Sequence, residues 1–307
     1  MTLHIATPLL PSNAFSGQAG ARVWLKMEAL QPSGSFKLRG IGHACETYAA
    51  RGARRIVASS GGNAGLAAAH AARRLGLPAL VVVPETTSER ARALLAREGA
   101  EVCVHGVSFQ EANAYAQSLL GSQDAFIHPF DDPLLWEGHA SMIDEVAQAG
   151  LRPDAVVLAV GGGGLLSGVV AGLRRQGWNE VPVFAVETEG ADSYAQSLAA
   201  GERIELPAIA SIATSLGARK VSQHAFELAS VHPITPVVVS DGEAVAACLR
   251  FMDEHRVVVE PACGAALALA WQEGGQLAAF QNVLVIVCGG ATATVAQLQA
   301  WHAQLGS

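Results

Sequence analysis

Residues 155–173 read Ala-Val-Val-Leu-Ala-Val-Gly-Gly-Gly-Gly-Leu-Leu-Ser-Gly-Val-Val-Ala-Gly-Leu. The stretch carries no charge and is long enough to suggest a transmembrane helix. It contains six glycines, four of them consecutive, and glycine is unfavourable inside a helix. A buried strand, a glycine turn and a buried helix explain this pattern better. The stretch therefore predicts a strand-to-helix unit, the building block of an α/β fold.

The turn Gly161 to Gly164 has the character of an anion-binding loop. Bare backbone N–H groups at a helix start attract a phosphate. Glu187 ends the next predicted strand, about where a dinucleotide-binding protein places its ribose-binding acid. The glycine spacing of that class, however, requires glycine where Leu166 stands, and no Gly-Lys-Ser/Thr follows as in a P-loop. The turn predicts phosphate binding of another kind.

Short apolar runs alternate with alanine-rich helical stretches along the whole chain, which predicts a parallel α/β architecture. The predicted strands are Arg22–Met27, Arg55–Ser59, Ala79–Val83, Glu101–Val104, Ala125–His128, Ala155–Val160, Val181–Glu187, Val237–Ser240 and Val283–Cys288. The predicted helices include Leu66–Gly76, Ser88–Gly99, Pro133–Gly150, Leu165–Trp178, Asp241–His255 and Ala262–Glu273. Asp131 and Asp132 place capping carboxylates before a helix that begins at Pro133, and Ser240 and Glu243 are expected to form a capping box.

Composition narrows the class of protein. Of the 307 residues, 50% are hydrophobic and only 15% are charged, which suggests that part of the surface is buried in an oligomer. The net charge of −7 argues against nucleic acid or an anionic membrane as a partner, because both require a basic face. No signal peptide is visible at the start. The cysteines are scattered without a metal-binding spacing and predict reduced thiols in the cytoplasm: Cys45, Cys103, Cys248, Cys263 and Cys288.

Lys37 is a candidate nucleophile. The chain has three lysines, Lys26, Lys37 and Lys220, and arginine cannot form an imine. Lys37 follows Gly34-Ser35-Phe36 at a predicted helix start, where the helix dipole and an apolar neighbour lower the pKa of an amine. A solvated surface lysine is the alternative interpretation of this residue taken alone.

Two further segments follow predicted strands and could bind a ligand. Residues 59–65 read Ser-Ser-Gly-Gly-Asn-Ala-Gly and open a helix, so their backbone amides could hold a carboxylate, with Asn63 as an added donor. Cys288 ends a buried strand, where α/β proteins gather their ligands. A tight turn with a capping Asn63, and a small core residue at Cys288, are the structural alternatives. Glu260 could lie at the same edge of the sheet or merely begin a helix.

Taken together, these motifs resemble the fold-type-II pyridoxal phosphate (PLP) enzymes. They are Ser-Gly-Ser-Phe-Lys-Leu-Arg-Gly (33–40), the loop 59–65, the tetraglycine, Glu-Pro-Ala-Cys-Gly-Ala-Ala (260–266) and Val-Cys-Gly-Gly (287–290). With Phe-Asp-Asp-Pro-Leu (130–134) and Trp-Glu-Gly-His-Ala-Ser (136–141), the chain is most similar to the mammalian-type L-serine dehydratase/L-threonine deaminase family. This resemblance implies two open twisted α/β domains like those of the tryptophan synthase β subunit. A small domain, residues 34–134, would be inserted into a large one made of 1–33 and 135–307.

The resemblance also implies roles for individual residues. Lys37 would hold PLP as an imine and act as the base, Phe36 would flank the ring, Asn63 would bind the ring hydroxyl, and Cys288 would contact the ring nitrogen. The phosphate would lie on Gly161, Gly162, Gly163 and Gly164. The substrate would contact Ser60, Gly61, Asn63 and Ala64. A monovalent cation such as potassium would be held by Glu187 with Gly161, Ala191, Ser193, Leu216 and Ala218, because an all-oxygen shell suits a hard cation.

The implied reaction is elimination of water from the small amino acids L-serine or L-threonine, giving pyruvate or 2-oxobutyrate plus ammonia, in a homodimer. A neutral thiol at Cys288 favours elimination over transamination, since it cannot keep the ring nitrogen protonated. Gly61 presents no side chain to the substrate, which argues against racemisation. Within the same fold, β-replacement and racemisation are alternatives. From other classes, a nucleotide-binding dehydrogenase conflicts with Leu166, and an inactive binding protein conflicts with Lys37.

Overall fold

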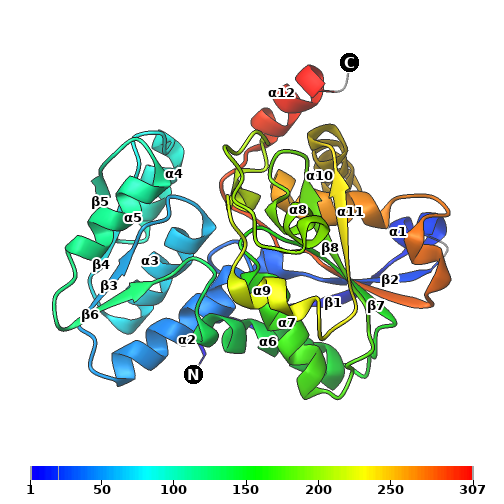
Figure 1. Cartoon of the computed structure of the whole chain (residues 1–307), viewed down its shortest axis with the longest axis horizontal. Helices are drawn as coiled ribbons and strands as arrows, with labels where there is room; N and C mark the ends of the chain where they lie inside the picture. Colours follow the sequence, from blue (N-terminus) through cyan, green and yellow to red (C-terminus); the bar gives the residue numbers. More distant parts are fainter. Residues whose placement is uncertain (1, 20, 306–307) are drawn as a thin grey trace.

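The computed structural model describes residues 2–19 and 21–305 and contains two β-sheets with helices packed on them. Figure 1 shows the sheets side by side, with α2 (Lys37–Ala50) and α6 (Pro133–Gln148) running beneath them. The two helices pack against each other and so connect the two halves. The predicted α/β class is confirmed.

The larger sheet has the strand order β1-β2-β10-β7-β8-β9. Its strands are parallel except β1, which pairs antiparallel with β2. Every residue of β7 and β8 is buried, as expected for parallel strands covered on both faces. The bounds are β1 Leu9–Ser12, β2 Arg22–Lys26, β7 Ala155–Ala159, β8 Val183–Thr188, β9 Ile234–Val239 and β10 Asn282–Ile286.

The smaller sheet is wholly parallel, in the order β5-β4-β3-β6. Its strands are β3 Arg55–Ala58, β4 Ala79–Val83, β5 Glu101–Val104 and β6 Asp124–Ile127. All of them lie in the chain between β2 and β7 of the larger sheet. The division at residues 34 and 134 remains a prediction.

The remaining elements connect and cover these strands. The α-helices besides α2 and α6 are α1 Asn13–Ala19, α3 Asn63–Leu75, α4 Glu89–Arg97, α5 Phe109–Ser118, α7 Gly164–Arg175, α8 Ser193–Ala200, α9 Gln223–Leu228, α10 Asp241–His255, α11 Pro261–Ala270 and α12 Val295–Leu305. The 3-10 helices are η1 Glu28–Leu30, η2 Thr214–Leu216 and η3 Gln276–Ala279. Both predicted caps are present: Asp132 accepts from the N–H of Leu134, and Ser240 forms a capping box with Glu243.

The sequence prediction missed β1 and began β9 too late. Both strands lie at an edge of the larger sheet, and both contain a proline, Pro11 in β1 and Pro236 in β9. Proline has no N–H to donate to a neighbouring strand, so a proline in a segment argues against a central strand. An edge strand tolerates proline, because one of its sides has no partner. The stretch 155–173 forms β7, the glycine turn and the first part of α7, as predicted. Among the described residues, no helix is both long and apolar enough to cross a membrane.

A buried ionic cluster fixes the start of α2. Arg39 is completely buried, and its guanidinium donates to Glu28 in η1 at 2.7 Å and to Glu145 in α6 at 2.7 Å. Lys26 of β2 also pairs with Glu145. Removing one partner would leave an uncompensated buried charge, so the cluster specifies how α2 sits against the larger sheet. Lys37 lies on the first turn of the same helix.

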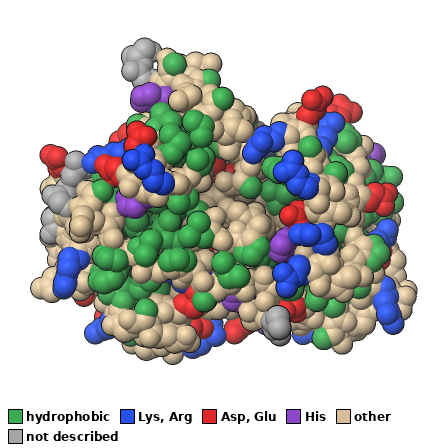
Figure 2. All heavy atoms as spheres, turned by 180° about the vertical axis from the view of Figure 1, so that it is seen from behind, with side chains coloured by type: hydrophobic (Ala, Val, Ile, Leu, Met, Phe, Trp, Pro, Cys, Tyr) green, Lys and Arg blue, Asp and Glu red, His purple; other side chains and the backbone are tan. Residues whose placement is uncertain are grey.

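Hydrophobic side chains also gather on one face of the surface. Figure 2 shows a broad apolar area over the back of the larger half of the molecule, interrupted by a few charged side chains. This agrees with the low charge content of the chain.

Candidate active site

Two distant loops meet beside Lys37. The N–H of Phe36 donates to the carbonyl of Cys288 at 3.1 Å, and the N–H of Gly290 donates to the carbonyl of Gly34 at 2.8 Å. The loop before α2 is thereby attached to the carboxyl end of β10. Ligands of open parallel sheets bind at this end of the strands.

Lys37 is the first residue of α2 and is half-buried. Its Nζ donates to the carbonyl of Pro129 at 2.8 Å and lies 5.0 Å from the centre of the Phe36 ring. Burial lowers the pKa of Lys37 to about 8, against opposing effects of Cys288 and Glu260. This is the direction predicted from the helix start and the apolar neighbour, and burial is its largest cause.

The other lysines are placed differently. Lys26 is buried, donates to the carbonyl of Thr7 and is engaged by Glu145. Lys220 is exposed. Lys37 is therefore the lysine whose amine is both partly desolvated and directed to the carboxyl edge of the sheets.

The tetraglycine forms a tight turn between β7 and α7. Gly163 has a φ of 94°, a left-handed conformation that favours glycine, and provides no side-chain cap for α7. A Cβ on Gly162 would lie 2.3 Å from the ring of Phe130, and one on Gly163 would lie 2.3 Å from Cβ of Ala225. Close packing therefore explains part of the glycine content, and the uncapped start of α7 leaves N–H groups for an anion.

Asn63, the first residue of α3, connects the two halves of the molecule. Its amide nitrogen donates to Glu260 at 2.6 Å and to Ser215 at 3.3 Å, and its oxygen accepts from the N–H of Ala291 at 3.1 Å. Thr292 donates to the other oxygen of Glu260 at 2.7 Å. Asn63 is thus fixed by contacts with the larger half.

Glu260 is a buried carboxyl at the start of α11 whose pKa is raised by burial, although these hydrogen bonds oppose the shift. Its position resolves the alternatives left by the sequence, because Glu260 both precedes α11 and faces Asn63. In the sequence, the only indication that Glu260 contacts the site was its position just before a predicted helix.

Cys288 follows β10 and is buried. A hydrogen bond with Cys263 and burial raise the pKa of the Cys288 thiol well above its ordinary value, while Lys37 opposes the shift. The thiol is therefore neutral. It lies on the loop that contacts Phe36, as described above.

The loop after β3 leaves space that a neighbouring turn fills. Ser60 Oγ accepts from the N–H of Gly62 at 3.2 Å. A Cβ on Gly61 would lie 2.6 Å from Cγ2 and 2.9 Å from Oγ1 of Thr87. Gly61 itself presents no side chain, but the Thr87 side chain reaches this place from the turn before α4. The sequence contains no signal for this contact.

A small cavity of about 160 Å³ lies beside Ser88 and Glu260. It is lined from the smaller half by Ser88 and from the larger half by several polar groups, among them Ser215, Glu260 and Thr292. Its volume is below the roughly 300 Å³ at which sites for drug-sized ligands begin, so it suits a small ligand.

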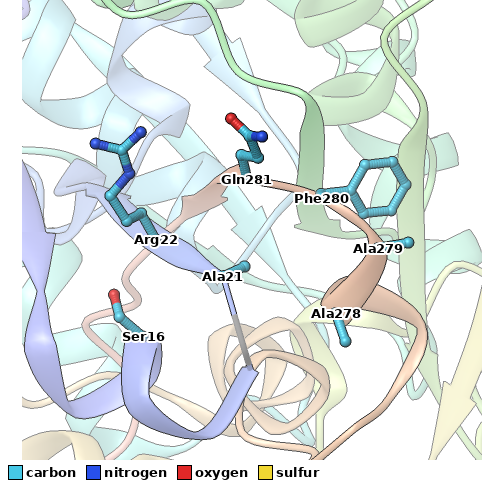
Figure 3. A pocket seen from close by; sticks show the side chains of 7 residues that line it. All are labelled: Ser16, Ala21, Arg22, Ala278, Ala279, Phe280 and Gln281. Carbon is cyan, nitrogen blue, oxygen red and sulfur yellow. The ribbon is translucent and has the colours of Figure 1, made fainter.

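A second hollow, of about 550 Å³, opens at the other end of the larger sheet. Figure 3 shows its side chains, which include Ser16, Arg22, Phe280 and Gln281. These residues lie at the amino ends of β2 and β10, whereas Cys288 follows the carboxyl end of β10. The hollow is separate from the candidate site.

The predicted cation ligands fall near two loops of the larger half. Glu187 in β8 is completely buried, and its two oxygens accept from the N–H groups of Tyr194 and Ala195 at 2.9 and 2.8 Å. Burial raises the pKa of Glu187 to about 8. The hydroxyl of Ser193 is buried without a recorded partner among the described residues. Ala191 donates its N–H to Thr188.

Gly161 packs directly against the backbone of Leu216, whose carbonyl accepts from the N–H of Ala218 at 2.7 Å. Gly161, Leu216 and Ala218 are therefore neighbours. Within the described part of the chain, no group of three or more His, Cys, Asp or Glu side chains could hold a metal ion. Any cation here would depend on carbonyl and hydroxyl oxygens besides Glu187.

The chain matches the family described as "Pyridoxal-phosphate dependent enzyme" over residues 1–289. It is 48% identical to the human "L-serine dehydratase/L-threonine deaminase", with 99% of this chain and 96% of that protein covered. It is 50% identical to the mouse "Serine dehydratase-like" protein, with 99% of this chain and 95% of that protein covered.

Among solved structures, a fungal L-serine ammonia-lyase from Rhizomucor miehei matches with a TM-score of 0.91 and 34% identity over 99% of both chains. Threonine deaminase isoform 2 from Solanum lycopersicum matches with a TM-score of 0.89 and 27% identity over 99% of this chain and 84% of that one. The protein belongs to the pyridoxal-phosphate dependent enzymes and has the type II fold of that family. The dehydrogenase and inactive-protein alternatives are thereby rejected.

Proposed function

We propose that this enzyme is an ammonia-lyase that removes water from L-serine and/or L-threonine, giving pyruvate or 2-oxobutyrate plus ammonia. The observation that supports this most is the Lys37 amine, whose pKa is lowered by burial against opposing effects of Cys288 and of Glu260, the partner of Asn63. Relatives named for serine and threonine dehydration match essentially the whole chain.

The residues present fit pyridoxal phosphate. Lys37 would hold it covalently, Phe36 would flank its ring, and Asn63 would bind its ring hydroxyl. The glycine turn before α7 would hold its phosphate at an uncapped helix start, and the neutral Cys288 would face its ring nitrogen. When bound, PLP supplies an electron sink for the bond broken at the substrate's α-carbon.

Groups of this protein would then accept the proton of the substrate's α-carbon and orient the substrate. Lys37 must be a neutral amine to accept the α-proton, and a pKa of about 8 provides more neutral amine near pH 7 than an ordinary lysine would. Its hydrogen bond to Pro129 directs Nζ. The uncapped start of α3, residues Ser60 to Ala64, would hold the substrate carboxylate through its backbone N–H groups.

An amino-acid panel and the absorption spectrum of the purified protein test this function together. We expect bound PLP, and release of 2-oxo acid from L-serine, L-threonine or both. Release from neither would contradict the proposal. After borohydride reduction, peptide mapping should find the cofactor on Lys37, and label on Lys26 or Lys220 would contradict that attachment. Lys37→Ala should lose the covalent link, whereas Lys220→Ala, at an exposed control position, should retain it.

We also propose a monovalent cation, with potassium as the expected ion, beside Glu187. The support is a fully buried carboxylate that receives only backbone N–H groups, next to the buried hydroxyl of Ser193. Gly161, Ala191, Leu216 and Ala218 would complete the shell with oxygen atoms.

Finally, we propose that the enzyme is a cytoplasmic homodimer with no nucleic-acid or membrane partner. The five free cysteines support a reducing compartment. The low charge content and the apolar area in Figure 2 support burial of surface between two copies.

A further inference from the structure

The turn before α4 carries a side chain that the functional account above does not use. Thr87 donates its N–H to the carbonyl of Pro84 at 3.0 Å, and the next residue, Ser88, caps α4 by accepting from the N–H of Ala91 at 3.2 Å. The turn is therefore held from both sides. Thr87 is partly exposed, while its neighbour Thr86 is exposed.

The Thr87 side chain, with both its methyl group and its hydroxyl, occupies the space that a side chain at residue 61 would take. Its Oγ1 lies 2.9 Å from the place of a Cβ on Gly61, and its Cγ2 lies 2.6 Å from it. Only a glycine at 61 allows Thr87 to approach so closely. Across this contact, the turn before α4 supplies a hydroxyl that the loop after β3 lacks at residue 61.

This hydroxyl is available to a ligand. Within the described part of the chain, Thr87 Oγ1 makes no hydrogen bond to another residue. The hydroxyl of Ser60, by contrast, already accepts from Gly62. The residue after Thr87, Ser88, lines the small cavity opposite Ser215 and Glu260, which bind Asn63.

The loop beside Thr87 is suited to an anion. α3 begins after Gly62 without a side-chain cap, so its first N–H groups are free of intrahelical partners and its dipole is positive at this end. A hydroxyl next to such a helix start would complete the donors around a carboxylate. A hydrogen bond to a charged group is among the stronger contacts that a threonine can make.

We propose that Thr87 is a substrate-binding residue whose hydroxyl donates a hydrogen bond to the carboxylate of the amino-acid substrate, in place of a side chain at Gly61. The proposal rests on the function proposed above, in which the loop Ser60 to Ala64 receives that carboxylate. It identifies Thr87 as a contact from the turn before α4.

Two substitutions in the PLP-loaded enzyme separate the hydroxyl from the shape of the side chain. Thr87→Val keeps the shape and removes the donor, whereas Thr87→Ser keeps the donor and removes the methyl group. Thr86→Val makes the same change at the exposed neighbour. We expect Thr87→Val to raise the KM for L-serine about tenfold or more with kcat changed less than about threefold, because binding to a group present throughout the reaction is lost.

Calorimetric titration with L-alanine and L-alaninamide measures the same contact without turnover. Thr87→Val should weaken binding of L-alanine about tenfold but leave L-alaninamide, which lacks the carboxylate, within about twofold of wild type. Thr87→Ser and Thr86→Val should bind both like wild type.

Unchanged binding of L-alanine by Thr87→Val would overturn the proposal. Equal weakening by Thr87→Ser, or equal weakening towards L-alaninamide, would overturn it too, because packing of the turn would then explain the loss. If the wild type released no 2-oxo acid, the proposed elimination would fail. The L-alanine titration would still decide the role of Thr87.

Discussion

Lys37 is partly buried and hydrogen-bonded to a carbonyl. Its protonation state should therefore set the rate at which it attaches the cofactor. Covalent attachment needs the neutral amine, and the pKa of Lys37 is lowered to about 8 by burial. We therefore expect the rate of PLP attachment to the stripped protein to rise with pH and to level off above pH 8. Stopped-flow absorbance across pH 6 to 10 measures this. A rate that still rises steeply near pH 10, as for an ordinary lysine, would contradict the assignment.

Cys288 sets the charge near the cofactor ring. Its thiol is neutral because Cys263 and burial raise its pKa. Cys288→Asp would place a carboxylate there and favour a protonated ring nitrogen, so we expect bound PLP, elimination from L-serine slowed about tenfold, and more transamination. Pyruvate and pyridoxamine phosphate are measured by chromatography. Cys288→Ser is the neutral control, and wild-type elimination by Cys288→Asp would refute the reasoning.

Gly61 and Thr87 form a pair that bears on reaction type. Gly61 has no side chain, and we propose that the Thr87 hydroxyl binds the substrate carboxylate, so neither residue is assigned to return a proton to the α-carbon. We expect L-serine to give pyruvate with negligible D-serine, as chiral chromatography would show. D-serine formed at a rate comparable to pyruvate would sink this expectation.

The same pair should respond cooperatively to substitution. Gly61→Ser places a Cβ 2.6 Å from Thr87 Cγ2, so that variant should bind L-serine poorly. Adding Thr87→Ala removes the clash but also the Thr87 hydroxyl, so the double variant should bind L-serine better than Gly61→Ser but more weakly than wild type, which makes the two changes non-additive.

At the scale of an element, Glu187 of β8 is buried at the start of α8, and burial raises the pKa of its carboxyl although the N–H groups of α8 oppose the shift. The folded-state pKa of this carboxyl is about 8, above its ordinary value of 4.5. Between these pH values the folded protein holds a proton that the unfolded chain releases, so Glu187 makes stability fall as pH rises. A cation beside the carboxylate would oppose this fall.

We therefore expect the melting temperature of the wild type, relative to that of Glu187→Gln, to decrease from pH 5 to pH 8 in tetramethylammonium buffer, and to decrease less in potassium buffer. Differential scanning calorimetry measures both series. Glu187→Gln should weaken the pH dependence and abolish the difference between the cations, because it removes the titrating group. Identical pH profiles of the wild type in the two buffers would argue against a cation site.

At the scale of the whole molecule, the apolar face in Figure 2 predicts self-association. We expect light scattering to give twice the chain mass of 31.7 kDa over a wide range of protein concentration. A stable mass of one chain would contradict the proposed dimer.

The sequence by itself determined the local parts of this protein. The glycine turn at 161–164, the helix start at Lys37 and the caps at Asp132 and Ser240 could all be predicted, because each depends on backbone freedom and hydrogen bonds between near neighbours. The order of motifs was also sufficient to indicate the family.

Only the tertiary structure decided which of these parts meet. Asn63 contacts Glu260 across 197 positions of the chain, and Thr87 fills the space beside Gly61 from another loop. The tertiary structure also showed how far Lys37 is buried, and this burial lowers the pKa of its amine. The physical reason is that such contacts depend on how two sheets pack against each other, and packing brings together residues that no spacing in the sequence connects.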